Sequence, residues 1–327
     1  MKDRADWQIE LSQCITDMAS LIEFLDLPAD WVKKNTLAQS VFQLKVPRPY
    51  LNRINKQDPN DPLLLQILPL SQELIDTKGY TQDPLAEKQY NPIPGVLHKY
   101  TSRILVTTAG ACSINCRYCF RRHFPYENNA VNTDHWDHIK KYLHQHPHVN
   151  EVILSGGDPL LLKDSQILNI YQSISQVPSI KRIRIHTRLP IAIPQRITDK
   201  LVAAVTSCDV KPIIVIHCNH PQEIDNDVAQ ALNLLYQAGI CVLNQTVLLK
   251  GINDHSQTLV GLSEKLFECN VMPYYLHALD KVQNTSHFDI PISQAQSIHG
   301  QLKAILPGFL VPKLVKEDPH QSNKTWV

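Results

Sequence analysis

Cys112-Ser113-Ile114-Asn115-Cys116-Arg117-Tyr118-Cys119 is the stretch from which the fold and the chemistry of this chain can be predicted. It spaces three thiols by three and two intervening residues, directly after an apolar run typical of a β-strand. Such spacing lets three thiolates converge on one soft metal centre, and iron–sulfur clusters are held by closely spaced cysteines. A four-iron cubane with three protein ligands would keep one iron open, which makes a reactive site rather than a closed structural one.

A small zinc site is the main alternative for this stretch. His123 follows Cys119 after three intervening residues, so the triplet and this histidine have the donors of a Cys3His zinc site. Zinc modules usually place two close ligand pairs across a longer loop, whereas this triplet is contiguous. Three buried thiols without a ligand are a third interpretation. Tyr118 and Phe120 flank the last cysteine, as expected for a loop that shields a cluster from water.

Length and charge limit the classes of protein to which the chain can belong. Its 327 residues suffice for one large barrel or two modest domains. With 32 Lys and Arg against 31 Asp and Glu the net charge is +1, which gives no electrostatic reason to expect nucleic acid or an anionic membrane as a partner. No signal-peptide core follows Met1, and no apolar run approaches the ~18 residues of a membrane span. We expect a soluble protein.

The other cysteines do not resemble the disulfide framework of a secreted domain. Their distribution through otherwise apolar segments predicts reduced thiols in the core. A reducing cytoplasm is therefore the expected location, and it also suits an oxygen-sensitive cluster. These cysteines are Cys14, Cys208, Cys218, Cys241 and Cys269.

Residues 1–81 are predicted to form a helical N-terminal region. Apolar residues recur at roughly helical spacing over 6–27, which predicts one amphipathic helix. A second helix is expected from Pro28 through Leu37, and a third over 62–75. We expect this region to serve packing alone.

A composition of turns then separates this region from the rest of the chain. Residues 82–95 contain three prolines and a glycine, and we predict that they form a linker. From 96 to 327 short β-branched runs alternate with helical stretches, which predicts one further domain. Strands are expected at 103–108, 151–155, 181–187, 212–217, 240–248, 272–277 and 310–315, and helices at about 134–146, 164–176, 194–206, 222–238 and 256–268.

The alternation predicts parallel strands in an α/β fold. Runs such as 213–216 are apolar at every position, as in strands covered on both faces. Repeated βα units close into a barrel or form a doubly wound sheet. No glycine-rich dinucleotide loop or Walker loop follows any predicted strand, so no motif supports a Rossmann fold. Nearly every strand ends in a polar residue, and catalytic groups of barrels lie at strand C-termini, which favours a barrel.

A second candidate site follows the second predicted strand. Ser155-Gly156-Gly157-Asp158 has two glycines that let the backbone approach a ligand closely. Exposed backbone groups together with Asp158 are suited to bind an ammonium group. A tight strand-to-helix turn is the alternative for this stretch.

The cysteine loop, with aromatic Tyr118 before its last cysteine, resembles the signature of the radical S-adenosylmethionine (SAM) enzymes. The resemblance implies that Cys112, Cys116 and Cys119 hold a [4Fe–4S] cluster. Its open iron would chelate SAM, which an added electron cleaves to a 5′-deoxyadenosyl radical. The positions that match SAM-binding residues are Ser155, Gly156, Gly157, Asp158, His217 and Gln245.

Further motifs narrow the resemblance to the lysine 2,3-aminomutases, over about residues 82–324. It implies a partial (β/α)6 TIM-like barrel whose mouth faces the cluster and a pyridoxal 5′-phosphate (PLP). It also implies an isomerase that converts L-α-lysine to β-lysine by a 2,3-amino shift. The matching motifs lie at 94–100, 119–122, 217–221, 244–254 and 273–277.

A 1,2 amino shift needs a radical generator, a carbonyl carrier for the nitrogen, and anchors for the charged ends of the substrate. Lys324 matches the lysine that holds PLP as a Schiff base, although residues 319–323 replace the family's glycine-rich run. Without the resemblance Lys324 would be interpreted as a solvated lysine. Tyr100 and Arg103 match residues near the ring and phosphate of PLP, and an arginine is well shaped for phosphate.

The anchors implied by the resemblance are an arginine and two carboxylates. Arg121 matches the residue that clamps the substrate carboxylate, a pairing suited to the planar guanidinium. Asp280 matches a carboxylate that receives the ε-ammonium of lysine, and Glu317 replaces a second family aspartate. Such a pair favours lysine, because an unpaired buried charge costs several kcal/mol. Surface ion pairs with neighbouring lysines are the alternative. The expected catalytic residues are thus Lys324, Arg121, Asp280 and Glu317.

The similarity is greatest to the short bacterial branch, which supplies (R)-β-lysine for modification of translation elongation factor P. It rests on Glu317, on residues 311–315, and on the absence of a C-terminal cysteine-rich extension. Free lysine as substrate, an electron donor such as flavodoxin or ferredoxin, and a homo-oligomer fit this assignment. The histidine-rich tract at 144–148 is interpreted as a polar helix end. An aminomutase for another amino acid and a zinc-stabilised binding module remain the alternatives.

Overall fold

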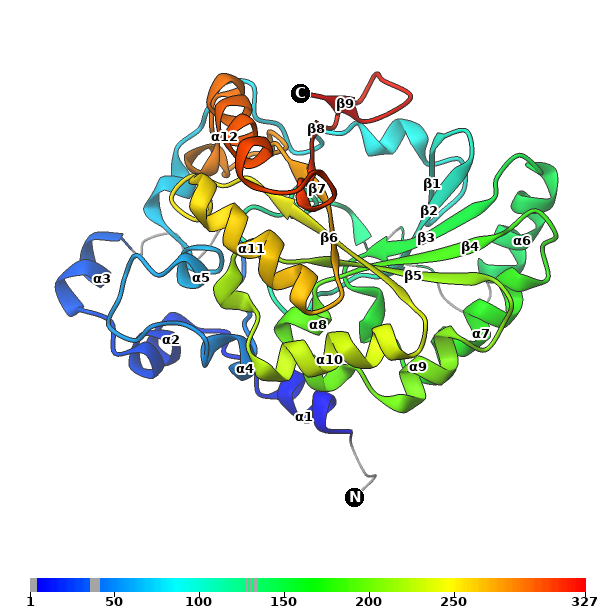
Figure 1. Cartoon of the computed structure of the whole chain (residues 1–327), viewed down its shortest axis with the longest axis horizontal. Coiled ribbons are helices and arrows are strands. Elements are labelled where there is room, and N and C mark those ends of the chain that lie inside the picture. The colour runs from blue at the N-terminus through cyan, green and yellow to red at the C-terminus, as the bar shows by residue number, and fades with distance from the viewer. Residues whose placement is uncertain (1–4, 36–41, 127–128, 130, 132–134) are drawn as a thin grey trace.

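The computed structural model describes residues 5–35, 42–126, 129, 131 and 135–327. A nine-stranded sheet forms its centre, and the strands lie in the same order as along the chain (Figure 1). Neighbouring strands from β2 to β8 are parallel, while β1 and β9 are antiparallel edge strands. The strands are β1 (Val96–Tyr100), β2 (Arg103–Ala109), β3 (Glu151–Gly156), β4 (Arg182–Thr187), β5 (Lys211–His217), β6 (Cys241–Val247), β7 (Met272–His277), β8 (Lys313–Lys316) and β9 (Thr325–Trp326).

A helix follows each strand from β2 to β7, which gives six βα units in the described chain. These helices cover the outer face of the curved sheet (Figure 1). The arrangement confirms the predicted partial (β/α)6 barrel. The helices are α6 (His135–Gln145), α7 (Asp164–Ser175), α8 (Leu189–Ala192), α9 (Asp199–Val205), α10 (Asn226–Gln237), α11 (Ser256–Glu268) and α12 (Ile292–Ile305).

Alternation along the strands separates an outer face from the barrel interior. On β6, Val242, Asn244 and Thr246 are buried, while the residues between them are half-buried. The half-buried set includes Gln245, and on β4 it includes His186. Polar side chains therefore reach the interior near the carboxyl ends of the strands, where barrels carry their sites.

The predicted strands all form within a few residues of their expected bounds, but β1, β9 and α12 are among the elements that the sequence analysis does not predict. β1 and β9 are the edge strands, and β9 is two residues long, too short for a periodic signal. α12 buries Ala295, Ile298 and Leu302 on one narrow face, and its polar positions hide that periodicity. The predicted helix over 194–206 is shorter than expected, because α9 begins only after the Thr198 cap.

The single helix predicted over 6–27 is wrong. The chain forms α1 (Asp6–Ser12) and α2 (Met18–Leu25) instead. Between them Ile15 pairs with Val46 in a two-residue bridge, with N···O distances of 2.8 and 3.0 Å. The side chain of Asp17 then caps α2 by accepting the Ser20 N–H at 2.9 Å. A buried strand-like contact thus replaces one helical turn.

The helix predicted over 62–75 is also wrong. α5 (Pro62–Leu65) ends after one turn, and a 3₁₀ turn follows at η1 (Ser71–Leu74). Pro69 lies between them and cannot donate an intrahelical hydrogen bond. The second predicted helix forms as α3 (Ala29–Asn35), and its predicted end at Leu37 lies outside the described residues. A further turn, α4 (Arg48–Leu51), lies before α5.

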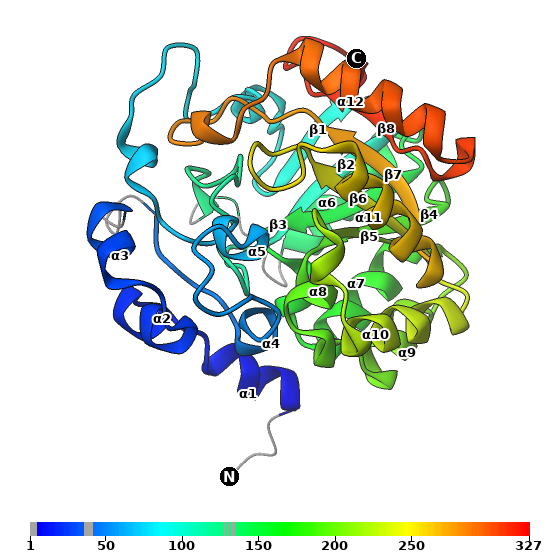
Figure 2. The same cartoon turned by 60° about the vertical axis from the view of Figure 1, so that its left-hand side comes forward.

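The N-terminal helices pack along one side of the barrel (Figure 2). One continuous apolar cluster joins residues of this region, such as Leu25 and Tyr50, to barrel residues such as Ile183. The segment predicted as a linker contains a 3₁₀ turn, η2 (Glu87–Tyr90), and its Tyr90 hydroxyl donates to the Pro319 carbonyl at 2.6 Å. The proposed division at 81/82 and 95/96 stays a prediction.

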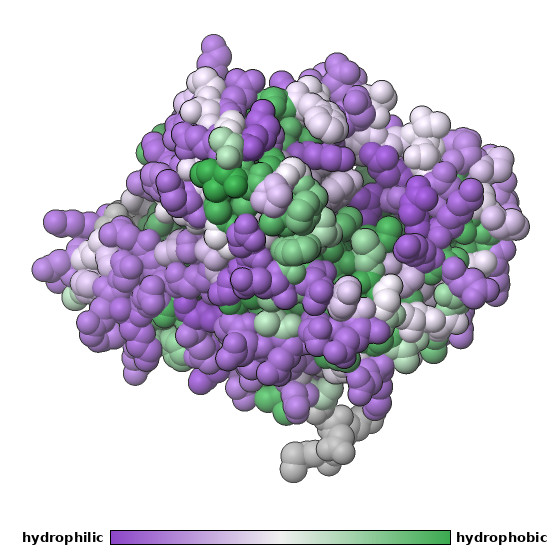
Figure 3. Space-filling view, in the orientation of Figure 1, coloured by the Kyte–Doolittle hydropathy of each residue, from purple (hydrophilic) through white to green (hydrophobic). Residues whose placement is uncertain are grey.

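The surface seen in Figure 3 is mostly polar, with apolar residues gathered over α11 and α12. Phe267 of α11 and Phe309 are both exposed, and their ring centroids lie 5.3 Å apart. No helix within the described ranges has the length and apolar character that spanning a membrane requires.

Buried ion pairs connect the N-terminal region to the cysteine loop. The Glu73 carboxylate accepts from Arg117 Nε at 2.7 Å and Nη2 at 2.6 Å, and from Arg122 Nη2 at 2.8 Å. All three side chains are fully shielded from solvent. The Arg117 Nη1 group also donates to the Phe42 carbonyl at 2.7 Å. The N-terminal region therefore fixes the loop as well as filling space beside the barrel.

Replacing Glu73 by alanine is expected to lower the free energy of unfolding by about 3–5 kcal/mol, because two guanidinium groups lose their buried counter-ion. Urea denaturation of the anaerobically purified protein, followed by circular dichroism, measures this change. Asp137→Ala is the control, because Asp137 forms an ion pair with Lys140 but its side chain is 84% exposed. This substitution should lower the free energy of unfolding by no more than about 0.5 kcal/mol. Equal losses in the two variants would contradict the assignment.

Candidate functional site

The loops that carry the predicted site residues meet at the carboxyl ends of the parallel strands. The cysteine loop follows β2, and residues 155–158 span the end of β3 and the start of the loop after it. His217 ends β5, Gln245 lies near the end of β6, and Lys324 precedes β9. Parallel strands bring these ends to one edge of the barrel.

Gly156 and Gly157 let the loop after β3 pack on the residues that begin the cysteine loop. The Gly157 N–H donates to the Ala109 carbonyl at 2.7 Å, and the Asp158 N–H donates to the Ala111 carbonyl at 2.8 Å. A Cβ at Gly157 would lie 2.1 Å from the Ala111 oxygen, and Gly156 has a φ of +107°. The two glycines therefore serve a close approach between backbones and hold the cysteine loop against the sheet.

The Asp158 carboxylate is taken up by donors of the chain itself. One oxygen accepts from Leu160 N at 3.0 Å and from the Thr187 hydroxyl at 2.6 Å, and the other from the Arg188 and Leu189 N–H groups at 2.8 and 3.0 Å. Burial raises the pKa of Asp158 although these bonds lower it. The side chain thus joins two loops, and it has no free face like the one expected for binding an ammonium group.

The three thiols of the cysteine loop influence one another electrostatically. All are half-buried and none is in a disulfide. Burial and the neighbouring Cys116 raise the pKa of Cys119 to about 11, and burial with Cys119 and Asp158 raises that of Cys112. Cys112 and Cys119 therefore keep their protons at neutral pH unless a metal replaces them. Three soft donors on one short loop fit the ligand set of an iron–sulfur cluster.

The Cys3His zinc alternative is not favoured by this geometry. Over the described residues, no three Cys, His, Asp or Glu side chains are grouped as ligands of a single metal ion. A cubane places its cysteines on different iron atoms, so it does not need thiols that converge as closely as zinc ligands do.

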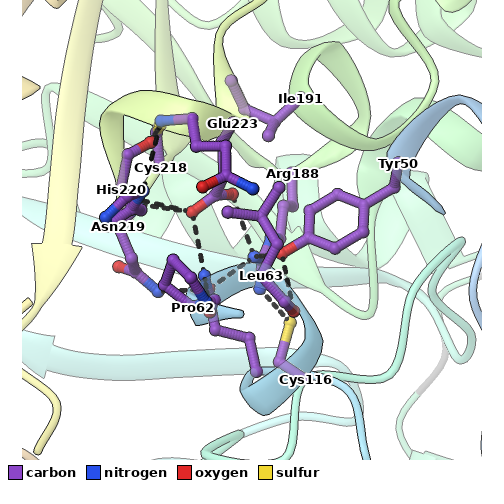
Figure 4. A network of polar contacts seen from close by, with 12 residues as sticks. Tyr50, Pro62, Leu63, Cys116, Arg188, Ile191, Cys218, Asn219, His220 and Glu223 are labelled. Atoms are coloured by element: carbon purple, nitrogen blue, oxygen red, sulfur yellow. Dashed lines mark hydrogen bonds and ion pairs between the residues drawn. The ribbon is translucent and has the colours of Figure 1, made fainter. Parts of the chain in front are cut away.

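A polar network surrounds Cys116 (Figure 4). Arg188, directly after β4, donates through Nη1 to the Cys116 sulfur and to the Tyr118 hydroxyl. Its Nη2 donates to Glu223 Oε2 at 3.0 Å and to Gln66 Oε1 at 2.8 Å. The network therefore connects the cysteine loop with both the barrel and the N-terminal region.

Arg121, predicted to clamp a carboxylate, already holds one. Its Nε and Nη2 donate to Glu87 of η2, with the shortest contact at 2.5 Å, and its Nη1 donates to the Ser155 hydroxyl at 3.0 Å. Arg121 is 7% exposed and Glu87 is 14% exposed. Burial alone would lower the pKa of Arg121, but Glu87 raises it overall. A small pocket lies beside this ion pair and is lined in part by Glu87, Phe120 and Arg121.

Lys324 and Glu317 face each other across the β8–β9 hairpin. Lys316 pairs with Thr325 in the ladder, so these two residues begin and end the connecting loop. Lys324 Nζ lies 2.5 Å from Glu317 Oε2, and Glu317 Oε1 accepts from Lys99 at 3.0 Å and from the Tyr100 hydroxyl. Burial opposes ionisation, but Lys324 and the two hydrogen bonds lower the pKa of Glu317 to about 2.

Asp280 lies within electrostatic reach of the other predicted catalytic residues. Burial raises its pKa to about 7, assisted by Glu317 and Glu87 and opposed by Lys324 and Arg121. The four residues predicted to handle the substrate are thus brought together at one end of the barrel. Two of the four residues are carboxylates. Glu317 accepts hydrogen bonds, whereas the Asp280 carboxylate accepts none from the described residues.

Buried histidines near Lys324 have ring nitrogens without partners. The Nε2 atoms of His186 and His277 have no hydrogen bond within the described chain. Burial lowers the pKa of both rings well below the usual value, with Lys324 contributing in the same direction. Neutral imidazoles beside an amine fit a polar cofactor such as PLP. Arg103 stacks 4.0 Å above the Tyr100 ring, which places the two residues predicted near PLP side by side.

His217 and Gln245 contact each other, as neighbouring residues of paired strands. The ring Nε2 of His217 lies 2.8 Å from Gln245 Nε2. Burial, with Arg188 and Arg121, lowers the pKa of His217 to about 3. The imidazole is therefore neutral, and its Nε2 accepts the amide hydrogen.

The sequence did not reveal several charged residues that complete this site. Glu87 lies in the stretch that was assigned to a linker, and Glu73 in the region that was assigned to packing alone. Arg188 and Glu223 lie after β4 and β5. The polar residues at the ends of these strands indicate a site there, but they do not identify Arg188 or Glu223 as part of it. Their partners are distant in the sequence, so spacing could not identify them.

Comparison with known proteins agrees with this geometry. Residues 106–261 match the Radical SAM superfamily. An L-lysine 2,3-aminomutase of Haemophilus influenzae is 43% identical over 99% of this chain and 96% of its own length. The corresponding proteins of Buchnera aphidicola and Escherichia coli are 46% and 43% identical, over 99% and 98% of this chain and 96% and 94% of their own lengths. The chain therefore belongs to the L-lysine 2,3-aminomutase family of radical SAM proteins.

Proposed function

We propose that this protein is an L-lysine 2,3-aminomutase, an isomerase that moves the 2-amino group of L-lysine to carbon 3. The observation that carries the proposal is the meeting of Arg121, Asp280, Glu317 and Lys324 at the barrel end that also holds the three thiols. Family membership supports the same reaction. The arrangement supplies opposite charges for the two ends of an amino acid and an amine for a carbonyl cofactor.

Cys112, Cys116 and Cys119 would hold a [4Fe–4S] cluster at the end of β2. When bound together with SAM, such a cluster would supply the one-electron chemistry that generates a radical from SAM. The 155–158 loop, His217 and Gln245 lie at the neighbouring strand ends and are proposed to contact SAM. Because the Asp158 side chain is already bonded to the chain, we assign the contact with the amino group of SAM to the loop backbone.

Lys324 would hold PLP, which when bound supplies a carbonyl carrier for the migrating nitrogen. Its Nζ must lose a proton before it can act as a nucleophile. Glu317 Oε2, 2.5 Å away, keeps the side chain directed into the barrel, but its pKa of about 2 makes it a weak acceptor for that proton. Tyr100 and Arg103, on and beside β1, would contact the cofactor ring and phosphate.

Arg121 and Asp280 would bind the two charged ends of lysine. The guanidinium of Arg121 is bound to Glu87, so the substrate carboxylate must share it with that residue or displace it. Asp280 would receive the ε-ammonium. Glu317 is already bonded to Lys99 and Lys324. It therefore attracts the ε-ammonium of the substrate less strongly than the family resemblance implies.

The finer assignments follow from the resemblance to the short bacterial branch. We propose that the product is (R)-β-lysine, used to modify translation elongation factor P. The eight free cysteines suit a reducing cytoplasm. A low-potential donor such as flavodoxin or ferredoxin would supply the electron, and we propose that the enzyme forms a homo-oligomer.

Product analysis tests the function directly. The protein is purified and reconstituted without oxygen, reduced with dithionite, and incubated with SAM, PLP and a panel of amino acids. We expect β-lysine from lysine and no product when SAM or PLP is omitted. A product from another amino acid at a higher kcat/KM would assign the chain to a related aminomutase. A colourless protein with stoichiometric zinc would instead support the binding module.

Lys324→Ala is expected to abolish the absorbance band of covalently bound PLP while leaving the iron content unchanged, because the cofactor loses its amine but the cysteine loop does not change. Absorption spectra and iron analysis of the purified variants measure both quantities. Lys316→Ala is the matched control, since this exposed lysine lies on β8 next to Glu317. An unchanged band in the Lys324 variant would place the Schiff base elsewhere.

The pH dependence of lysine binding is expected to follow Asp280. Its pKa of about 7 means that the carboxyl is mostly neutral below pH 7 and charged above it. KM for lysine should therefore fall about tenfold between pH 6 and 8, the ratio of the ionised fractions. Steady-state kinetics of the wild type and Asp280→Asn measure it, and Asp137→Asn is the control. If KM of the Asp280→Asn variant depends on pH as steeply as KM of the wild type, Asp280 does not bind the ε-ammonium of lysine.

A further inference from the structure

Arg188 occupies the point where three parts of the molecule meet. It follows β4 directly and its residue is 5% exposed. Figure 4 shows its guanidinium between Cys116 of the cysteine loop, Tyr50 of the N-terminal region and Glu223 of the barrel. An arginine keeps its charge in such a setting, because its guanidinium does not deprotonate in proteins.

The two terminal nitrogens of this guanidinium donate to different parts of the molecule. Nη1 donates to the Cys116 sulfur and to the Tyr118 hydroxyl. Nη2 donates to Glu223 Oε2 at 3.0 Å and to the Tyr50 hydroxyl at 3.3 Å. The Nε–H has no partner in the described part of the chain although it is buried. One donor thus remains for a bound group.

Glu223 is held in place by backbone and side-chain groups in addition to Arg188. It is completely buried, and its Oε1 accepts the Asn219 N–H at 2.9 Å and the His220 N–H at 3.1 Å. The Gln66 amide donates to the same oxygen at 3.2 Å. Backbone groups after β5 therefore fix the counter-ion, and the counter-ion fixes the orientation of Arg188.

A fixed cation beside a ligating sulfur has a definite electrostatic consequence. Hydrogen bonds to the sulfurs and nearby charge are among the factors that set the potential of an iron–sulfur cluster. Reduction adds one electron to a cluster that three thiolates already make negative. A positive charge next to one thiolate stabilises the reduced form more than the oxidised form, and a negative charge does the opposite.

We infer that Arg188, with Glu223 as its counter-ion, is a positioning residue for the iron–sulfur cluster, which orients the Cys116 ligand and makes the one-electron reduction of the cluster easier. The inference rests on the cluster of the proposed function. The electron itself comes from a low-potential one-electron donor. Arg188 neither gives nor takes a proton in this step.

Redox titration of the reconstituted protein tests this role without requiring activity. The [4Fe–4S] protein is reduced stepwise with dithionite, in the absence of SAM, PLP and lysine, and the reduced cluster is measured by electron paramagnetic resonance. The variants are Arg188→Gln, Arg188→Lys and Glu223→Gln. Arg196→Lys is the matched control, because Arg196 is equally buried but donates to the Leu160 and Leu162 carbonyls.

The two glutamine variants are expected to shift the potential in opposite directions. Arg188→Gln should lower the equilibrium constant for reduction about tenfold, a shift of about 59 mV to more negative potential for a one-electron couple. Glu223→Gln removes the negative partner and should shift the potential to more positive values. Arg188→Lys keeps the charge and should recover most of the loss, while Arg196→Lys should match the wild type.

A wild-type potential in Arg188→Gln that retains its iron would overturn the inference. If that variant does not retain iron, Glu223→Gln and Arg188→Lys decide the matter. A potential that does not become more positive in Glu223→Gln, or one that falls by about 59 mV or more in Arg188→Lys, contradicts the inference. Failure of the proposed function has a different signature, since a wild-type protein that never assembles a cluster would refute both proposals before any variant is compared.

Discussion

The bond between the buried Glu73 carboxylate and two arginines of the cysteine loop is the contact on which the site most depends. Three closely spaced cysteines can hold a metal centre only if their loop keeps one conformation, and a loop of this length has no regular structure to define it. Glu73 supplies the constraint from the N-terminal region, with contacts of 2.6 to 2.8 Å to Arg117 and Arg122. The glycine contacts after β3 supply it from the barrel. Charge buried in this way is costly unless it is fully paired, so the N-terminal region and the barrel must fold around each other.

The mouth of the barrel also contains paired charges. Arg121 is bound to Glu87, and Lys324 to Glu317. Each pair contains one group proposed to act on substrate or cofactor and one carboxylate of the chain that occupies it. Asp280 differs, because its pKa is raised to about 7 and no hydrogen bond of the described residues satisfies its carboxylate. It is therefore the group most ready to receive a cation from outside the protein.

Much of this arrangement could be predicted from the sequence, because it depends on local patterns. The parallel strands have continuous apolar runs, and the cysteines have a spacing that indicates a cluster. The family resemblance supplied Lys324, whose position near the end of the chain gives no signal of its own. Local patterns failed where long-range contacts decide the structure. Ile15 interrupts a helical repeat because Val46 pairs with it, and Glu73, Arg188 and Glu223 have partners more than thirty residues away in the chain.

The central claim is that three thiols leave one iron of a cubane open to SAM. The most direct measurement is the yield of 5′-deoxyadenosine and methionine per electron supplied to the reconstituted protein, compared between the wild type and Cys116→Ala. We predict that the wild type cleaves SAM when it is reduced and that the variant, which lacks one of the three ligands, does not. A wild type that holds its cluster but never forms 5′-deoxyadenosine under reduction, or a variant that forms as much as the wild type, would contradict the account.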